Sequence, residues 1–518
     1  MLRYIIRLIP VSIIEQLEYR TLEKFPLALL VATRTDPRIF EEISERKALR
    51  EFREAVENVP AYRDFLKKRK VDYKSIRNIA DFEEKVPEMT KDNYIKKYEM
   101  ENICRDGKLP EVGNIDESAG SSGEPTNWMR NIEEERFLSK IVQFDFDYTY
   151  GGDKKEYIVL SAWASGPWAT GVKFCELMQN YSLVKNTDAD IENIVKTLKK
   201  FGYNYNYLIA GYPPFIKNLV DCGKIKWGKY KNIDILTGGE GFVPEWRAYI
   251  KSKLGKKTKI ISAYGSSDLD IGIAVETQFS IFIRDLLAKN KELRRELCGH
   301  EDKIPMVFQF DPLQHYIKNV TVTRKDGAKI NEFQVTMLNP KTESPKIKYN
   351  IHDEGGVLGF EEMSRRLRVH EPDYLKKFRK NGGIIRKMLH FPFLMVIGRS
   401  DGTISLDGAN VYPHNIEVGL HCNKKLAGIT SNFKISNRID KKKDACFIVC
   451  IELKKGVKPS KSLRTIYHDT IFKKLLEINS DYRRSYKNNN SLKPTIKLFE
   501  YGKGHFKDKN TIKNRYII

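Results

Sequence analysis

The chain has 518 residues, 41% of them hydrophobic and 11% aromatic, which excludes a disordered chain and predicts a globular protein of roughly two to four domains. Its net charge of +23 suggests phosphate-bearing partners, although a lysine-rich surface alone does not make nucleic acid an expected one. Seven cysteines lack metal-binding spacing, so we expect reduced thiols in a cytoplasmic protein.

The first 100 residues are predicted to form a helical lead-in to the large domain. Arg3, Arg7 and Pro10 interrupt the apolar N-terminus before the roughly 20 residues that a membrane span needs, and no signal-peptide core follows. We expect this segment to pack against the body of the protein; the alternative is an interfacial helix. From Ile39 to Val56, apolar residues recur three and four positions apart, which predicts an amphipathic helix.

Residues 101–398 alternate short apolar runs, glycine-containing turns and helical stretches. The runs at 157–163, 205–213, 233–242, 259–268 and 333–338 predict an α/β domain with parallel strands, whose ligands bind where the strands end. The stretch around 280–318 interrupts this pattern and is interpreted as a lid or a dimer contact, which leaves a homodimer open.

Residues 399–518 are predicted to form a smaller, basic α+β domain. Strands are expected at 433–437, 445–454 and 495–501, with a helix over 460–477. Residues 401–518 contain 24 lysines and arginines against 11 acidic residues, which suits a phosphorylated cosubstrate or an acidic partner.

The segment from Glu117 to Thr126, ESAGSSGEPT, concentrates glycine and small hydroxyl residues in one turn. Such a turn can wrap a polyphosphate, because glycine lets backbone N–H groups approach an anion and hydroxyls add donors without bulk. A flexible linker has a similar composition, so this segment alone does not decide between the two.

Four further segments follow in order: TGGEG at 237–241, YGSSD at 264–268, KYNIHDEG at 348–355 and GRSDG at 398–402. With the loop at 118–126 they resemble the adenylate-forming superfamily of acyl-CoA synthetases, and within it the phenylacetate–CoA ligase branch, which includes CapK-like proteins. In that branch threonine commonly follows the proline of the loop, and here that residue is Thr126. The resemblance implies a large adenylation domain and a small, mobile C-terminal domain.

The resemblance implies ATP, Mg²⁺ and CoA as cofactor and cosubstrates, and it assigns a role to each motif. The β- and γ-phosphates of ATP would be held by Ser118, Gly120, Ser121, Ser122, Gly123 and Thr126. The adenine pocket would be lined by Gly239, Glu240, Tyr264 and Gly265, with the Tyr264 ring stacked on the base. Ser267 would reach the α-phosphate, and Asp268, where the family commonly has glutamate, would hold magnesium.

The remaining roles concern the ribose and the small domain. Asp353 would bind the ribose hydroxyls, Arg399 would lie near ribose and phosphate, and Asp401 would be the hinge of the small domain. Gly408 would line the passage for the CoA thiol. The family pattern expects a lysine for the α-phosphate where this chain has Ile512, so the neighbouring Lys513 is the preferred candidate and Lys509 the alternative.

The sequence therefore predicts an ATP-dependent ligase that converts a carboxylic acid into an adenylate and passes it to CoA. One alternative is a different acceptor, such as an amine, a hydroxyl that receives AMP, or an acidic carrier protein docked on the basic small domain. Another is a basic RNA-binding or scaffold protein with a decayed site. Loops near the expected cleft carry aromatic residues for an acid pocket, namely Trp163, Trp168, Tyr212, Phe215 and Phe242.

Overall fold

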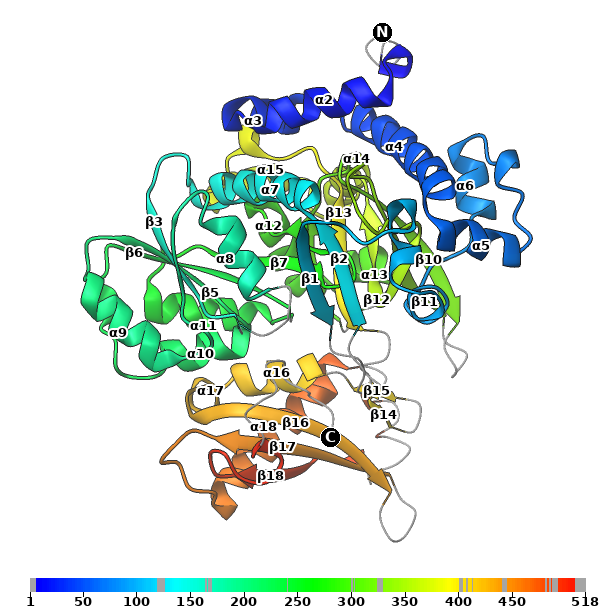
Figure 1. Ribbon diagram of the computed structural model, residues 1–518. Helices are drawn as coiled ribbons and strands as arrows, with labels where there is room; N and C mark the ends of the chain where they lie inside the picture. The colour runs from blue at the N-terminus through cyan, green and yellow to red at the C-terminus, as the bar shows by residue number, and fades with distance from the viewer. Residues whose placement is uncertain are drawn as a thin grey trace.

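The computed structural model shows a large upper body and a smaller lower one, joined near residue 400 (Figure 1). It describes residues 6–118, 126–163, 165, 170–239, 241–299, 301, 303–323, 329–399, 404–406, 409–411, 413–439, 445–479, 482–483, 486 and 492–507. Among these residues no helix is both long enough and apolar enough to cross a membrane.

Helices dominate the first 100 residues, as predicted. The long helix expected from the spacing of apolar residues is α4, which buries Ile39, Phe52 and Val56. Its start is fixed by Asp36, whose carboxylate accepts a hydrogen bond from the Arg38 backbone N–H at 3.0 Å. The helices are α2 (Val11–Leu22), α3 (Phe25–Arg34), α4 (Pro37–Asn58), α5 (Pro60–Lys68) and α6 (Ile79–Lys85).

One 11-stranded sheet forms the centre of the large body, in the order β10-β11-β12-β13-β9-β8-β7-β6-β5-β3-β4. Strands β4, β3, β5, β6 and β7 are parallel, which confirms the predicted α/β pattern, whereas the other half of the sheet is antiparallel. The strands are β3 (Tyr157–Ser161), β4 (Leu183–Asn186), β5 (Asn206–Ala210), β6 (Asn232–Gly238), β7 (Ile260–Ser266), β8 (Asp270–Val275), β9 (Met306–Gln309), β10 (His315–Thr323), β11 (Lys329–Met337), β12 (Tyr349–Leu358) and β13 (Phe393–Arg399).

Two expectations for this domain were wrong. The run at 333–338 belongs to β11, which pairs antiparallel with both neighbours, because it returns directly from β10 without a crossover helix. The stretch at 280–318 is no lid, since it supplies β9 to the interior of the sheet and two covering helices. These are α12 (Gln278–Lys289) and α13 (Lys291–Cys298), which share an apolar cluster with α14 (Phe360–His370) and α15 (Tyr374–Lys380).

Helices cover both faces of the parallel strands. In β3, Ile158 and Leu160 pack into one apolar cluster, whereas Tyr157 and Val159 pack into another on the opposite face, as the two-residue period of a strand requires. The first face is covered by α9 (Ile191–Phe201), α10 (Pro213–Val220) and α11 (Pro244–Leu254) and the second by α7 (Ile132–Tyr150) and α8 (Val172–Met178).

The small body has its own apolar core and a three-stranded sheet in the order β16-β17-β18. The predicted strands and the helix at 460–477 are confirmed. The elements are β14 (Ile404–Leu406), β15 (Ala409–Val411), α16 (Pro413–His421), α17 (Lys424–Ile429), β16 (Thr430–Ile439), β17 (Ala445–Leu453), α18 (Lys461–Ile478) and β18 (Thr495–Phe499).

Candidate active site

The predicted phosphate loop connects two paired strands, β1 (Gly113–Ser118) and β2 (Thr126–Asn131). Ser118 and Thr126 are direct partners in this antiparallel pair, so the segment between them closes a hairpin and does not link two domains. Gly120, Ser121, Ser122 and Gly123 lie outside the described residues. Their phosphate-binding role stays a prediction.

The YGSSD segment ends β7 and begins the connection to β8. A side chain on Gly265 would place its Cβ 2.6 Å from the Asp270 carbonyl oxygen, so only glycine fits where these two antiparallel strands approach each other. The neighbouring Tyr264 hydroxyl donates a hydrogen bond to Asp353 Oδ2 at 2.7 Å. The structure thus brings together two predicted nucleotide-binding residues that are 89 positions apart in the chain.

Asp353 lies in β12 directly opposite Arg399 in β13. Asp353 follows His352, whose φ of 61° turns the chain where β12 is irregularly paired with β11. The pairing of β12 with β13 therefore brings Asp353 and Arg399, the two residues predicted to bind the ribose, next to each other in the sheet. The side chain of Arg399 is outside the described part of the structure. Asp401, Gly408 and Lys513 also lie outside it, and their roles stay predictions.

Asp268, the predicted magnesium ligand, has two partners in the structure. The Tyr349 hydroxyl donates to Asp268 Oδ2 at 2.7 Å, and the Lys91 ammonium lies 3.3 Å from Oδ1. Lys91 Nζ and Lys346 Nζ lie 5.3 Å and 5.1 Å from the centre of the Trp128 ring. Burial, reinforced by nearby Arg130, lowers the pKa of Lys346.

Gly239 has a φ of 72°, and a Cβ on it would lie 2.6 Å from the Tyr212 ring. This ring makes an edge-to-face contact with Trp163, with centroids 4.7 Å apart. These two of the predicted aromatic residues therefore form a wall beside the Gly239 turn, whereas Phe242 packs on Trp246 in the core at 4.6 Å. Glu240 and Trp168 are outside the described residues.

A buried charge network, which sequence reasoning missed, supports the hairpin and the turn. Arg130 of β2 donates to the Ser267 carbonyl oxygen at 3.0 Å and to Glu134 at 3.0 Å. It also contacts Asp116 of β1 at 3.4 Å. The β1–β2 hairpin and the YGSSD turn are thereby joined through one guanidinium group, which is fully buried.

Lys173 of α8 extends this network. Its ammonium lies 2.9 Å from Asp270, 2.8 Å from Glu135 and 3.3 Å from Asp116. Burial alone would lower the pKa of Lys173, but the attraction of these carboxylates, Asp270 first, is larger and raises it. Burial alone would raise the pKa of Asp270, but the nearby Lys173 ammonium lowers it overall. Both groups therefore stay charged at neutral pH.

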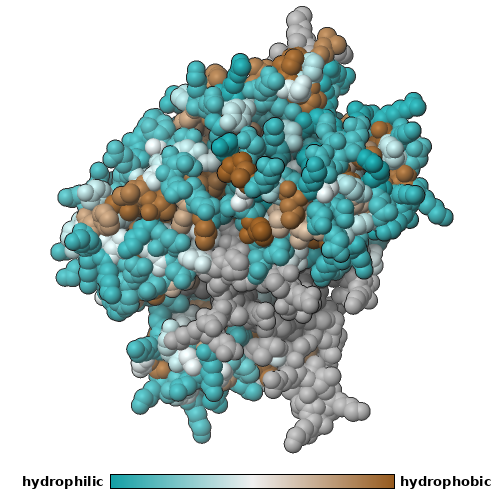
Figure 2. All heavy atoms as spheres, in the orientation of Figure 1, coloured by the Kyte–Doolittle hydropathy of each residue, from teal (hydrophilic) through white to brown (hydrophobic). Residues whose placement is uncertain are grey.

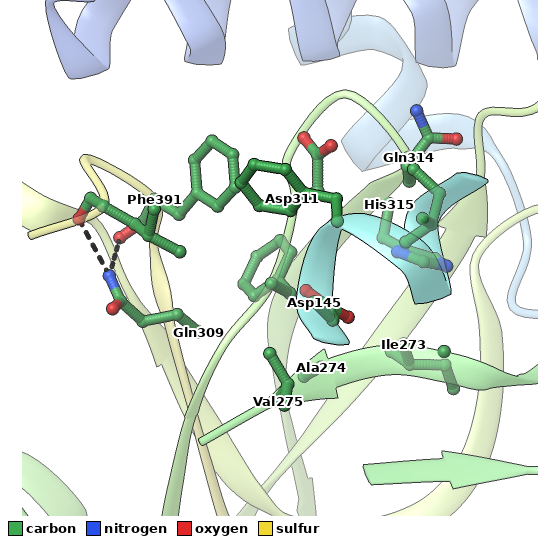
Figure 3. Close-up of a pocket in the computed structure, with 14 residues that line it drawn as sticks. Asp145, Ile273, Ala274, Val275, Gln309, Asp311, Gln314, His315 and Phe391 are labelled. Atoms are coloured by element: carbon green, nitrogen blue, oxygen red, sulfur yellow. Dashed lines mark hydrogen bonds between the residues drawn. The ribbon is translucent and has the colours of Figure 1, made fainter. Parts of the chain in front are cut away.

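A cavity of about 20 Å³ lies between α7 and strands β8 to β10 (Figure 3). Its size suits one water molecule, and none of the predicted nucleotide-binding residues lines it. His315 Nδ1 has no hydrogen-bond partner among the described residues. Burial lowers the pKa of His315 to about 4 and raises that of Asp311, on the same cavity, to about 6. This cavity is not the site of an organic substrate.

No family model matches the chain, and no curated protein matches it by sequence. Solved structures do match, and they show that the chain shares the fold of 2-hydroxyisobutyryl-CoA ligase. Structures of 2-hydroxyisobutyryl-CoA ligase match over 94% of this chain and 91% of that one at 13% identity.

The agreement depends on the state of that ligase. The TM-score is 0.66 for its postadenylation state in complex with R3-HIB-AMP and 0.53 for its thioesterification state with 2-HIB-AMP and CoA. An open conformation, with 14% identity over 92% of this chain and 91% of that one, gives 0.51. These comparisons confirm the predicted fold class, a large α/β body followed by a small C-terminal one.

Proposed function

We propose that the protein activates a carboxylic acid with ATP and transfers the acyl group to CoA. In the first step a carboxylate oxygen attacks the α-phosphorus, the bond to the β-phosphate oxygen breaks, and pyrophosphate leaves. In the second step the CoA sulfur attacks the acyl carbon, the thiol loses its proton, and AMP leaves. The observation that carries the proposal is the Tyr264–Asp353 hydrogen bond opposite Arg399, within this fold.

The residues suit these steps chemically. The two carboxylate oxygens of Asp353 match the vicinal hydroxyls of a ribose, and the Tyr264 hydroxyl fixes the carboxylate before ATP binds. Backbone and hydroxyl donors of the 118–126 loop would hold the β- and γ-phosphates. Ser267 would meet the α-phosphate, since its turn is fixed by Arg130.

Magnesium is part of the proposal. Among the described residues no cluster of three or more acidic, histidine or cysteine side chains could hold a metal ion. The single carboxylate of Asp268 nevertheless suits Mg²⁺, which commonly binds one or two carboxylates together with substrate phosphates. Bound there, the ion would neutralise charge on the departing pyrophosphate.

The small domain would supply the rest of the reaction. The closer match to a postadenylation arrangement supports the proposal that the present position of the small domain belongs to the first half-reaction. Asp401 would then be the hinge toward the second, Gly408 would line the path of the CoA thiol, and Lys513 would reach the α-phosphate. An Asp401→Ala variant that lost both half-reactions equally would contradict the hinge role.

A carrier-protein thiol is the second candidate acceptor. Residues 401–518 contain 24 lysines and arginines against 11 acidic residues, and this positive charge favours an acidic partner on the small domain. Thiol consumption measured with CoA and with an acidic carrier protein distinguishes the two. Consumption with the carrier alone would replace CoA in the proposal.

ATP–pyrophosphate exchange across a panel of aryl, fatty and hydroxy acids tests the adenylation step. We expect exchange that depends on one class of acid and is lost in Asp353→Asn, but is retained in Asp469→Asn, which changes an exposed aspartate of the small domain. A folded protein that binds ATP but exchanges with no acid would refute acid activation. RNA binding or AMP transfer to a hydroxyl would then be tested.

A further inference from the structure

The outer face of helices α2 and α3 exposes large apolar side chains. Ile13 and Leu17 are 45% and 54% exposed on α2, and Leu27 and Leu30 are 43% and 55% exposed on α3. Each pair is three or four residues apart, so each lies on one side of its helix. Figure 1 places both helices along the outermost edge of the large body, and Figure 2 shows apolar side chains where α2 lies.

The opposite faces of the same helices are fixed to the protein. Ile14 of α2 and Ala28 and Ala32 of α3 are buried. Glu18 of α2 forms an ion pair with Lys47 of α4 at 2.8 Å, and both side chains are buried. Because the inner faces are docked in this way, the outer apolar residues point away from the body and cannot turn inward.

The charge around these residues is positive. Arg20 of α2, Lys24 between the two helices and Arg34 of α3 are exposed. Their acidic neighbours are each held in an ion pair with a basic residue: Glu15 with Arg50, Glu18 with Lys47 and Glu23 with Lys140. The surface therefore combines apolar side chains with an excess of basic groups.

We propose that the outer face of α2 and α3 binds the surface of an anionic phospholipid bilayer. Apolar side chains would enter the boundary between headgroups and acyl chains, while Arg20, Lys24 and Arg34 would lie among the anionic headgroups. A second copy of this chain fits less well, because self-association would bring the same basic residues together. The net charge of +23 on the whole chain also attracts the protein to an anionic membrane surface. This proposal is independent of the proposed function.

Vesicle flotation with the full chain tests the proposal. The probes are vesicles of phosphatidylcholine alone and vesicles that contain about 30% phosphatidylglycerol. We expect the protein to float with the anionic vesicles only, and less so as salt is raised. Leu17→Asp and Leu30→Asp should each weaken binding about tenfold, because a half-exposed leucine is replaced by a charge of the wrong sign.

The charge contribution is tested separately with Lys24→Glu, which should weaken binding at least about fivefold. The matched control is Leu183→Asp, which changes a leucine of β4 that is 61% exposed and lies outside α2 and α3. All four positions are exposed, so unfolding is not expected, and circular dichroism of each variant checks it.

Four results would overturn the proposal. One is absence of flotation with either vesicle; another is equal flotation with neutral and anionic vesicles, which would remove the role of charge. The third is a concentration-dependent dimer in sedimentation experiments that Leu17→Asp abolishes, since a second copy of the chain would then cover this face. Equal loss of binding in Leu183→Asp would also contradict it.

Discussion

One buried ammonium group holds the small domain against the large one, and replacing it by methionine should loosen that contact. Lys217 Nζ of α10 donates to two carbonyl oxygens of the small domain, Ala427 at 2.6 Å and Thr430 at 3.1 Å. Asp221, which lies 3.3 Å from Lys217, also accepts a hydrogen bond from Lys454 of the small domain at 2.6 Å.

The size of the effect follows from two opposing contributions. Hydrogen bonds from a charged donor contribute about 1.5–3 kcal/mol each, or about 3–6 kcal/mol for the pair. Burial, followed by nearby Lys454, lowers the pKa of Lys217 from 10.5 to about 8, which corresponds to a cost of about 3 kcal/mol for the charged form. The difference is about 0–3 kcal/mol, so we expect Lys217→Met to weaken docking of the small domain by about 1.5 kcal/mol, or about tenfold.

Hydrogen exchange of backbone amides in α17 and β16 measures this effect. Exchange in these segments should accelerate in Lys217→Met and stay unchanged in Lys200→Met, which removes an exposed lysine of helix α9. Unchanged rates in Lys217→Met would refute the reasoning. Equal acceleration in the helices of the large body would show general unfolding instead of undocking.

Four further predictions concern the site and its support. Tyr264→Phe should weaken ATP binding about tenfold in calorimetry, because Asp353 loses the donor that orients it; unchanged affinity would contradict this role. Asp268→Asn should raise the Mg²⁺ concentration for half-maximal pyrophosphate exchange about tenfold, and an unchanged requirement would exclude Asp268 as the ligand. Arg130→Met should cost about 3–5 kcal/mol in urea unfolding, since buried carboxylates lose their partner; an unchanged midpoint would contradict this. His315, with a folded pKa of about 4 against 6.5 unfolded, contributes stability that is present above pH 6.5 and lost as the pH falls toward 4. Between pH 7 and pH 4, the free energy of unfolding of His315→Gln should therefore fall by about 3 kcal/mol less than that of the parent protein. Equal falls in both proteins would refute the assignment.

The parts of the fold that the sequence predicted share one property: their signal is local. The parallel strands were visible as apolar runs followed by glycine-containing turns, and α4 as apolar residues at helical spacing. The order of motifs indicated that Tyr264 and Asp353 belong to one site, and the structure places them in contact. Their roles in binding nucleotide stay predictions.

The parts that were missed depend on contacts between distant segments. Arg130 lies in a short polar strand where nothing marks it as buried, and its contact with the Ser267 carbonyl oxygen spans 137 positions. Lys173 follows a segment with no motif, yet it meets carboxylates from three other elements. A sequence pattern shows which residues are apolar, but not which charges will be buried together.

The partners of Asp268 bear on its proposed role as a magnesium ligand. Tyr349 holds one carboxylate oxygen at 2.7 Å, and Tyr349 is itself buried against the edge of Trp128. The aspartate side chain is therefore fixed in one orientation, while its other oxygen faces Lys91. In the proposed role of Asp268 as the magnesium ligand, the ion would therefore have to compete with the Lys91 ammonium for the same carboxylate.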